Sequence, residues 1–507
     1  MLRDVKHHVT DKNLGFATAT GDGKHLKIGV SPVVSDTPII ITGAMDAAQI
    51  KSRLGLSPLA DAVMDSVQFG ANRIYCVPVS ATTAGELGDV TKTGDGGGKV
   101  TVDGSPTNAF SVVIRFTAQG GLNSAAFVVS IDGGGGLNSA AFVVSIDGGS
   151  TFTEEVTVPV TGDYELEGTG IKVKFTEAEA EDQKPSSFLV NDTYTFTTTA
   201  PTMTNGDVLD AVTKLQNFAE EYEFVHIVGE SDLALWQAVG EAQVQLFETF
   251  HKPMFFVMEP GFPTPGEGGA PGIGAGTDEG DLTDWALEME AKAKKVRNYN
   301  IQVVAAWGRL VKLDGSTKIV NLAGLVSGFY AKSSVQTSIG KTREEAGFNI
   351  RKTKLEELLP VALDNDIIEL LDLAGFLTFR EYDGKDDYFV YHTKMLAPDG
   401  SDYRYAEDVR VLNKIIRETR KKGLDLMNDD IDLTDIQAEL EARAKFLFEP
   451  LQRMIDAKEI SAAEIIVMDG HEETFIEDET MRTKIRYLSR GYIREVYIDL
   501  ARRRPSA

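Results

Sequence analysis

The chain has 507 residues, of which 42% are hydrophobic and 25% are charged, and its formal net charge at pH 7 is −26. This length predicts about three domains with sizeable cores, and the composition is typical of a soluble globular protein. The acidic excess argues against general nucleic-acid or anionic-membrane binding, and no apolar run approaches the ~18 to 20 residues that a membrane span needs.

Residues 1–24 are polar and show little amphipathic pattern, so we expect an N-terminal arm. They lack the apolar segment of a signal peptide, which favours maturation in a cytoplasm. Residues 25–92 alternate strand-like runs with two helix signals. Asp46 with Gln49 forms a capping-box pattern, and Ser57 precedes a proline at the first helical position. This order predicts α/β structure.

Residues 93–202 differ from the preceding segment in composition and in hydrophobic pattern. Period-2 runs such as SVVIRF and IKVKF are separated by Gly-rich turns, and helix formers are scarce. The segment contains 14 acidic and 5 basic residues and no His or Cys. We therefore predict an inserted all-β domain with an acidic surface and no catalytic site.

One string of fifteen residues occurs twice in this insert without a change, as residues 120–134 and 135–149. Each copy holds the apolar run AAFVVSI followed by Asp-Gly-Gly, which predicts two successive strands joined by a loop at 132–139. A duplicated strand and turn is tolerated at the periphery of a domain. We interpret the repeat as a duplication without a function of its own.

Strand and helix patterns alternate again after residue 202, which predicts a parallel sheet covered by helices. Segments 25–92 and 203–395 would together form one discontinuous α/β core domain. We expect the stretch LEELLPVALDNDIIELLDLAGF to be helical and the stretches FLTFREYD and DYFVYHT to form a strand pair.

Residues 396–507 are predicted to form an α+β domain. Helices are expected at about 402–422 and from a capping box at Thr434 and Gln437, with a bend at Pro450. Strands AAEIIVMD, MRTKIRYLS and GYIREVYIDL close the chain. The predicted fold class is thus α/β plus β, with terminal arm strands.

Motifs for catalysis or cofactor binding fail on inspection. The stretch GDGGGKV has Val100 where a phosphate loop needs Ser or Thr. His471 and Glu472 begin a zinc-protease motif, but Phe475 stands at the second His position. The single cysteine, Cys76, excludes a cysteine metal site. We expect no catalytic residue, no metal and no cofactor.

Four basic residues share one face of the helix predicted at 402–422, because they are spaced 4, 3 and 4 apart. They are Arg410, Lys414, Arg417 and Lys421. One interpretation is a solvated face paired with nearby Glu, and the other is a docking stripe for an acidic partner protein.

The last predicted strand, GYIREVYIDL, lies at the end of the chain and directs alternate residues to its two faces: Tyr492, Arg494, Val496 and Ile498 to one, and Ile493, Glu495, Tyr497 and Asp499 to the other. A terminal strand can leave its own subunit and pair with the sheet edge of a neighbour. The residues that would take part are Tyr492, Ile493, Arg494, Val496, Tyr497, Ile498 and Leu500. The N-terminal arm, with Val5 and Val9, could do the same.

Taken together, four segments resemble the contractile tail sheath proteins of myophages and phage-tail-like particles. They are LKIGVSPVVSDTPIIITG, LADAVMDSVQFGANRIYCVPV, SDYRYAEDVRVLNKIIRETR and TKIRYLSRGYIREVYIDL. The resemblance covers roughly residues 25–92 and 203–500, and it lies in the order of these segments and in their residue patterns rather than in catalytic motifs.

The resemblance implies a structural subunit that polymerises helically around a tail tube and contracts, with energy stored in the extended lattice rather than in a nucleotide. Arm strands at about 3–20 and 481–500 would be exchanged between subunits, and the basic stripe would face the tube. The implied partners are copies of the chain, the tube protein, and baseplate and tail terminator proteins, with no direct nucleic acid and no membrane insertion. The implied location is a virion tail or tail-like particle, assembled in the bacterial cytoplasm.

Two other functions fit the sequence. The β insert could recognise a host glycan, which predicts ligand binding by residues 93–202. An α/β enzyme without a known motif would show turnover or a tightly bound small molecule.

Overall fold

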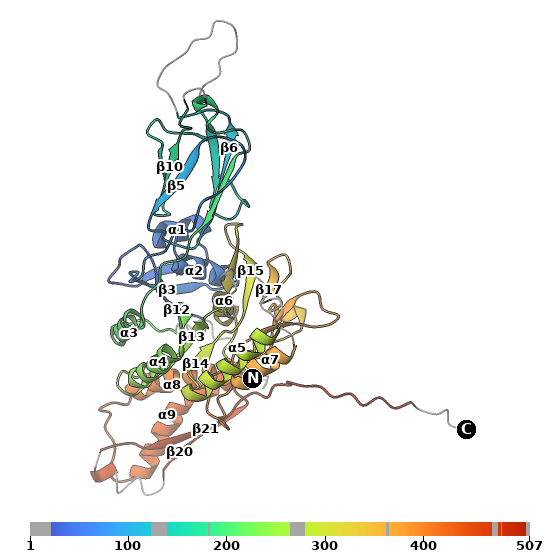
Figure 1. Cartoon of the computed structure of the whole chain (residues 1–507). Coiled ribbons are helices and arrows are strands. Elements are labelled where there is room, and N and C mark those ends of the chain that lie inside the picture. The colour runs from blue at the N-terminus through green and yellow to red at the C-terminus, as the bar shows by residue number, and fades with distance from the viewer. Residues whose placement is uncertain are drawn as a thin grey trace, which may run out of the picture.

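The computed structural model of the chain describes residues 22–122, 139–180, 183–263, 279–360, 365–468, 475–477 and 479–502. Figure 1 shows an elongated molecule with a β-rich part at one end, an α/β part in the middle and a helical part with a small sheet at the other end. The mixed α/β character predicted from the sequence is confirmed. None of the helices in the described part of the chain is both long and apolar enough to cross a membrane.

A six-stranded sheet forms the middle of the molecule, in the order β14-β13-β12-β1-β3-β2. The neighbouring strands are parallel except for β2, which is antiparallel to β3. The strands are β1 (His25–Val30), β2 (Ile39–Thr42), β3 (Arg73–Val79), β12 (Phe224–Ser231), β13 (Phe255–Pro260) and β14 (Ile301–Val303).

Alternate side chains of the parallel strands enter different cores, because successive strand residues point to opposite faces. Val225 and Phe256 pack with the helices of one face, whereas Phe224 and Phe255 pack on the other. Both faces are therefore covered, as parallel sheets require. The helices are α1 (Ala47–Leu54), α2 (Pro58–Gln68), α3 (Asn205–Lys214), α4 (Leu233–Glu248), α5 (Glu279–Val296) and α6 (Ala323–Lys332).

Local sequence signals set the starts of α1 and α2. Asp46 accepts a hydrogen bond from the Gln49 amide, and the Gln49 side chain accepts one from the Asp46 amide. Ser57 accepts from the Ala60 amide, with Pro58 at the first helical position. Both predicted caps are confirmed.

Smaller elements follow the central sheet. They are β15 (Trp307–Val311), β16 (Thr317–Asn321), β17 (Leu355–Leu359), α7 (Asn365–Ala374), β18 (Phe379–Glu381) and β19 (Tyr388–Val390). The sequence LEELL was predicted to be helical, and this prediction is wrong: it forms β17, which pairs antiparallel with β15. Pairing with a distant strand overrides the helix propensity of Leu and Glu. The β18–β19 pair is confirmed.

Between β3 and α3 the described residues form two antiparallel sheets, β4-β11-β6-β7-β8 and β5-β10-β9. The strands are β4 (Thr91–Thr93), β5 (Lys99–Gly104), β6 (Ser111–Ala118), β7 (Ala141–Ser145), β8 (Val156–Thr157), β9 (Asp163–Leu166), β10 (Ile171–Thr176) and β11 (Thr193–Thr197). The two sheets share a hydrophobic core in which Phe116 stacks on Phe188 at 4.4 Å between ring centroids.

The second copy of the repeat supplies β7, which pairs with β6. The first copy lies almost wholly outside the described residues, so the predicted pair of successive strands stays a prediction.

The last part of the chain contains α8 (Ala406–Leu424), α9 (Ile436–Asp456), β20 (Ala462–Val467) and β21 (Thr483–Leu488). Helix α9 continues through Pro450. Its cap is Asp435, which accepts from the Ala438 amide, and not Thr434 as predicted, because Thr434 donates to Asp432 instead. Short 3-10 turns occur at Lys184–Ser186, Leu215–Asn217 and Glu344–Ala346.

Candidate functional site

The C-terminal segment beyond β21 extends away from the body of the molecule (Figure 1). Within the described residues, 489–502 pair with no strand of their own subunit. The apolar side chains of this segment are exposed to solvent: Ile493, Val496, Tyr497, Ile498 and Leu500, at 86%, 69%, 82%, 75% and 93%. A segment rich in β-branched and aromatic residues is suited to a sheet, but this one pairs with no sheet among the described residues of its own chain.

Two side chains tie the root of this segment to the body. The Tyr492 hydroxyl donates to the carbonyl of Gln336 at 2.7 Å. Arg494 pairs with Glu407 in the first turn of α8, and its guanidinium lies 3.9 Å from the centroid of the Tyr405 ring. In this subunit Tyr492 and Arg494 are therefore anchors, and the unattached part begins at about residue 495.

The first half of the arm strand predicted at 481–500 is paired within its own subunit, so the arm is shorter than predicted. Residues Thr483–Leu488 form β21, which pairs with β20 in the same subunit. Ile485 and Tyr487 pack against the core that α8 and α9 share.

The β20–β21 sheet has two strands, and within the described residues neither strand pairs with a third. Both outer edges therefore present unpaired backbone N–H and C=O groups. Such an edge is a template for a further strand, and a two-stranded sheet is marginal by itself. The sheet lies beside α9 (Figure 1), and the residues of one of its faces are half-buried while those of the other are exposed.

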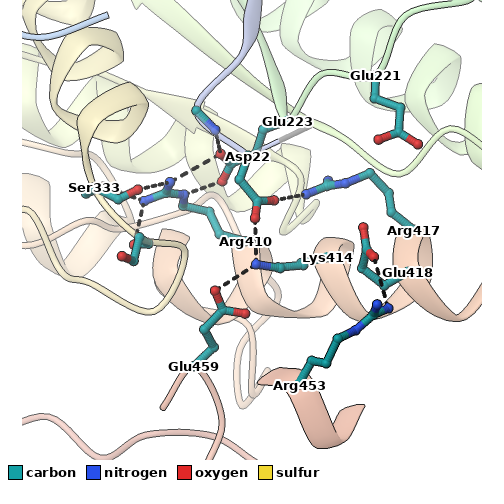
Figure 2. Close-up of polar contacts among 12 residues, drawn as sticks. Asp22, Glu221, Glu223, Ser333, Arg410, Lys414, Arg417, Glu418, Arg453 and Glu459 are labelled. Carbon is teal, nitrogen blue, oxygen red and sulfur yellow. Dashed lines mark hydrogen bonds and ion pairs between the residues drawn. The ribbon is translucent and has the colours of Figure 1, made fainter. Parts of the chain in front are cut away.

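The basic face of α8 does not point to solvent. The side chain of Arg410 is completely buried and pairs with Glu223, also completely buried, at the start of β12. Arg410 also donates to the Ser333 hydroxyl at 2.8 Å and to the carbonyls of Tyr330 and Ser333. Figure 2 shows this cluster between α8 and the central part of the molecule.

The other three residues of this basic face also pair within the subunit, and Figure 2 shows Lys414 and Arg417 beside their acidic partners. Lys414 lies 2.6 Å from Asp22 and 2.7 Å from Glu459, and Arg417 lies 2.9 Å from Asp22. Lys421 contacts Glu221 at 2.8 Å and Glu418 at 2.9 Å.

The tube-facing interpretation is therefore wrong for Arg410, Lys414 and Arg417, which are buried in this subunit. The alternative of a solvated face is wrong for them too, although pairing with acidic residues is correct. Their acidic partners come from distant parts of the sequence and fasten α8 to the central sheet. The cluster is an internal clamp, which we name the α8 clamp, and Lys421 is its partly exposed end.

Within the α8 clamp, Asp22 and Lys414 each stabilise the charged form of the other. Burial would raise the pKa of Asp22, but Arg417 and Lys414 outweigh this effect and hold the pKa below its ordinary value. Burial would lower the pKa of Lys414, but Asp22 and Glu459 raise it above its ordinary value. Asp22 is the first described residue, and its pairs with Lys414 and Arg417 fasten this end of the described chain to α8.

The predicted arm residues Val5 and Val9 lie outside the described residues. The same holds for the pair His471 and Glu472. Their roles stay predictions.

A row of buried polar side chains crosses the central sheet and was not predicted from the sequence. Lys27 Nζ lies 2.5 Å from His226 Nδ1, and His226 Nε2 lies 2.8 Å from Glu259 Oε1. Burial lowers the pKa of Lys27 to about 7 and raises that of Glu259 to about 7. The available signal was a charged or polar residue inside each apolar strand, in HLKIGV, FVHIVG and FFVMEP. The three side chains satisfy one another across β1, β12 and β13.

Metal ligation finds no support in the part of the chain that the structure describes. No group of three or more His, Cys, Asp or Glu side chains there could hold a metal ion. Burial raises the pKa of the Cys76 thiol to about 12, which suits a buried apolar side chain.

Comparison with known proteins gives the following matches. The N-terminal domain of the DUF2586 family matches residues 2–392, and its C-terminal domain matches residues 402–506. No curated protein sequence matches the chain.

Solved structures similar to the chain include sheath proteins. The sheath tail protein from Desulfitobacterium hafniense is 14% identical, with a TM-score of 0.47 over 92% of this chain and 93% of that chain. A sheath tail protein from Listeria innocua is 15% identical, with a TM-score of 0.46 over 93% and 96%. The PVC sheath complex of an extracellular contractile injection system, in its contracted state, is 10% identical, with a TM-score of 0.49 over 99% and 98%.

Proposed function

The chain belongs to the DUF2586 family, and we propose that it is the structural subunit of a contractile tail sheath, which polymerises helically around a tail tube. Contraction of the polymer would drive the tube through a target cell envelope. The observation that carries this proposal is the extended C-terminal segment, which exposes large apolar side chains and has no strand partner among the described residues of its own subunit.

Strand addition explains why the segment exposes apolar side chains and why it pairs with no strand among the described residues of its own subunit. Backbone hydrogen bonds to a sheet edge give affinity without requiring a particular sequence, and alternate side chains add specificity. The β20–β21 sheet offers such an edge, and residues 495–502 offer such a strand. A strand given to one neighbour and received from another makes a head-to-tail contact, which generates a ring or an open helical filament.

The same proposal assigns a role to each domain of the chain. Segments 25–92 and 203–395 are the core, 93–202 is an inserted all-β domain on the outer surface, and 396–507 is the assembly domain. In support, strands β4 to β11 have a hydrophobic core of their own and lie at the end of the molecule opposite to α9 (Figure 1). Residues 1–24 are a second arm, rooted at the α8 clamp through Asp22.

The partners proposed are those of a sheath: further copies of the chain, the tube protein, and baseplate and tail terminator proteins. The names of the similar solved structures describe sheaths and contractile particles, and that role comes to this chain as part of the proposal. Assembly in the bacterial cytoplasm and a final location in a virion tail or tail-like particle complete it.

Proline substitution in the C-terminal segment tests the proposal. Alternate residues of a strand direct their N–H groups to the same edge, and proline removes the donor. One variant carries Val496→Pro and Ile498→Pro, and the other carries Tyr497→Pro and Asp499→Pro. We expect at least one of them to remain folded and soluble but to form no polymer in sedimentation and negative-stain electron microscopy.

A matched control separates backbone pairing from side-chain burial. Val496→Thr with Ile498→Thr keeps both N–H donors, so it should still polymerise, at a higher critical concentration. Polymers of normal length and yield from both proline variants would show that strand addition through this segment is wrong.

A further inference from the structure

A groove of about 570 Å³ lies beside the root of the C-terminal segment. Residues 491–496 form one wall, and the loop at 338–343 forms another. Three half-buried tyrosine rings contribute its apolar surface: Tyr382, Tyr391 and Tyr492. The root of the C-terminal segment is therefore also the wall of a binding surface.

The groove is basic in a chain that is strongly acidic overall. Lys341 and Arg343 line it, are exposed, and form no ion pair among the described residues. Arg494 lines it as well, although it already pairs with Glu407. Glu495 is the carboxylate in the lining. Two cations thus remain available for an acidic partner.

The loop between α8 and α9, residues 425–435, is acidic, opposite in charge to the groove. It holds five aspartates, at positions 425, 429, 430, 432 and 435, and two exposed apolar side chains, Met427 at 67% and Leu433 at 66%. Local contacts use three of the aspartates: Asp429 pairs with Arg443, Asp432 accepts from Thr434, and Asp435 caps α9.

Two carboxylates of this loop remain. The side chains of Asp425 and Asp430 have no partner among the described residues. Large apolar side chains flanked by unpaired charges on a surface are typical of an interaction site.

The groove and the loop cannot meet within one subunit. Arg494, on the groove wall, binds Glu407 in the first turn of α8, whereas the loop follows the last turn of the same helix. A helix of 19 residues is about 28 Å long. The two complementary surfaces therefore lie at opposite ends of a rigid element.

We propose that the groove receives the α8–α9 loop of a second copy of the chain. This inference rests on the proposed function and names the contact that sets which neighbour a subunit joins. In this contact, Asp425 and Asp430 face Lys341 and Arg343. Met427 and Leu433 pack on the tyrosine rings, and the sulfur of Met427 favours contact with an aromatic ring. Because the contact joins two different surfaces, it can be repeated head to tail from one copy to the next, which generates a ring or an open helical filament.

Charge reversal in two separate variants tests the contact. The first variant carries Lys341→Glu and Arg343→Glu, and the second carries Asp425→Lys and Asp430→Lys. Each alone places like charges opposite each other, so we expect its critical concentration for polymerisation to rise by more than about tenfold at low salt. A one-to-one mixture should polymerise again, because each acidic groove then meets a basic loop and each basic groove meets an acidic loop.

A control matches the change in charge without touching either surface. Lys172→Glu with Lys174→Glu reverses two exposed lysines on β10, and it should polymerise as the unaltered chain does. Circular dichroism and thermal unfolding of every variant establish that it is folded. Normal polymerisation of either single-surface variant, or a mixture that fails to recover, would overturn the inference.

Failure of the proposed function gives a different result. If the unaltered chain forms no polymer under any condition, the sheath proposal fails, and the loop contact is tested by itself with cysteines at Thr342 and Asp430 on separate chains. The native Cys76 is buried and does not compete for a bifunctional maleimide. Cross-linked pairs between these two chains would support the contact, and their absence would refute it.

Discussion

Replacement of Arg410 by methionine tests whether the α8 clamp holds the C-terminal domain to the central sheet. The change keeps a long apolar side chain but removes the cation that faces Glu223, a carboxylate with no exposed surface. The hydroxyl of Ser333 and the carbonyls of Tyr330 and Ser333 lose their donor too.

Breaking a buried ion pair by removing one partner costs about 3–5 kcal/mol, because the other charge stays buried without compensation. At about 1.4 kcal/mol for each factor of ten, the equilibrium for opening at α8 should shift by roughly 10² to 10⁴. Because a chain of several domains need not unfold in one step, the local opening of α8 is the quantity to measure.

Hydrogen exchange followed by mass spectrometry measures that opening. In Arg410→Met, the amides of α8 should exchange faster by the factor given above, while those of β6 and β11 stay unchanged. Combining Arg410→Met with Glu223→Gln removes the buried charge and keeps an acceptor for the Gly23 amide, so it should recover most of the lost protection.

Arg453→Met is the matched control. Arg453 lies on α9, its side chain is 59% exposed, and it is 3.9 Å from Glu418. Loss of such an exposed pair costs less than about 1 kcal/mol. Equal protection in Arg410→Met and Arg453→Met, or no recovery in the double variant, would refute the assignment of the clamp.

Three other predictions concern Asp22, Cys76 and the repeat. The pKa of Asp22 lies below its ordinary value of 3.8, so its stabilising contribution is present above about pH 4 and is lost as the pH falls through the lower folded value; Asp22→Asn should lower the unfolding temperature at pH 6, and this difference should vanish in strong acid. Because burial raises the pKa of Cys76 to about 12, its thiol should react with an aromatic disulfide at pH 8 only after urea unfolds the chain, and fast reaction of the folded chain would contradict the burial. Deletion of residues 120–134 leaves one copy of the repeat to form β7 and should change neither the unfolding temperature nor polymerisation, whereas loss of assembly would show that the insert is not peripheral.

Local structure followed from local sequence wherever the decisive contacts are near in the chain. The caps at Asp46 and Ser57 were predictable, because each depends on groups three residues apart. Solved sheath structures are among those similar to the chain, as the resemblance in the sequence predicted. The LEELL stretch was mispredicted, because its partner strand β15 lies far earlier in the chain.

Spacing alone could not give the environment of the basic residues on α8. A spacing of 4, 3 and 4 establishes that Arg410, Lys414 and Arg417 share a face, but it carries no information about what covers that face. Glu223 lies 187 residues before Arg410, and Asp22 lies 395 residues before Arg417. A face that reads as a docking surface in the sequence is thus an internal clamp in the fold.

By itself the sequence determined the α/β character, two helix caps, the strand-forming residues of 492–500 and the lack of a recognised catalytic motif, because each depends on residue type and short spacing. Only the tertiary structure decided that α8 is clamped, that β21 belongs to its own subunit and that the C-terminal segment is anchored at Tyr492 and Arg494. Only the tertiary structure also brought a basic groove and an acidic loop to opposite ends of one helix. The physical reason is that burial and charge pairing depend on residues brought together by packing, which spacing along the chain does not encode.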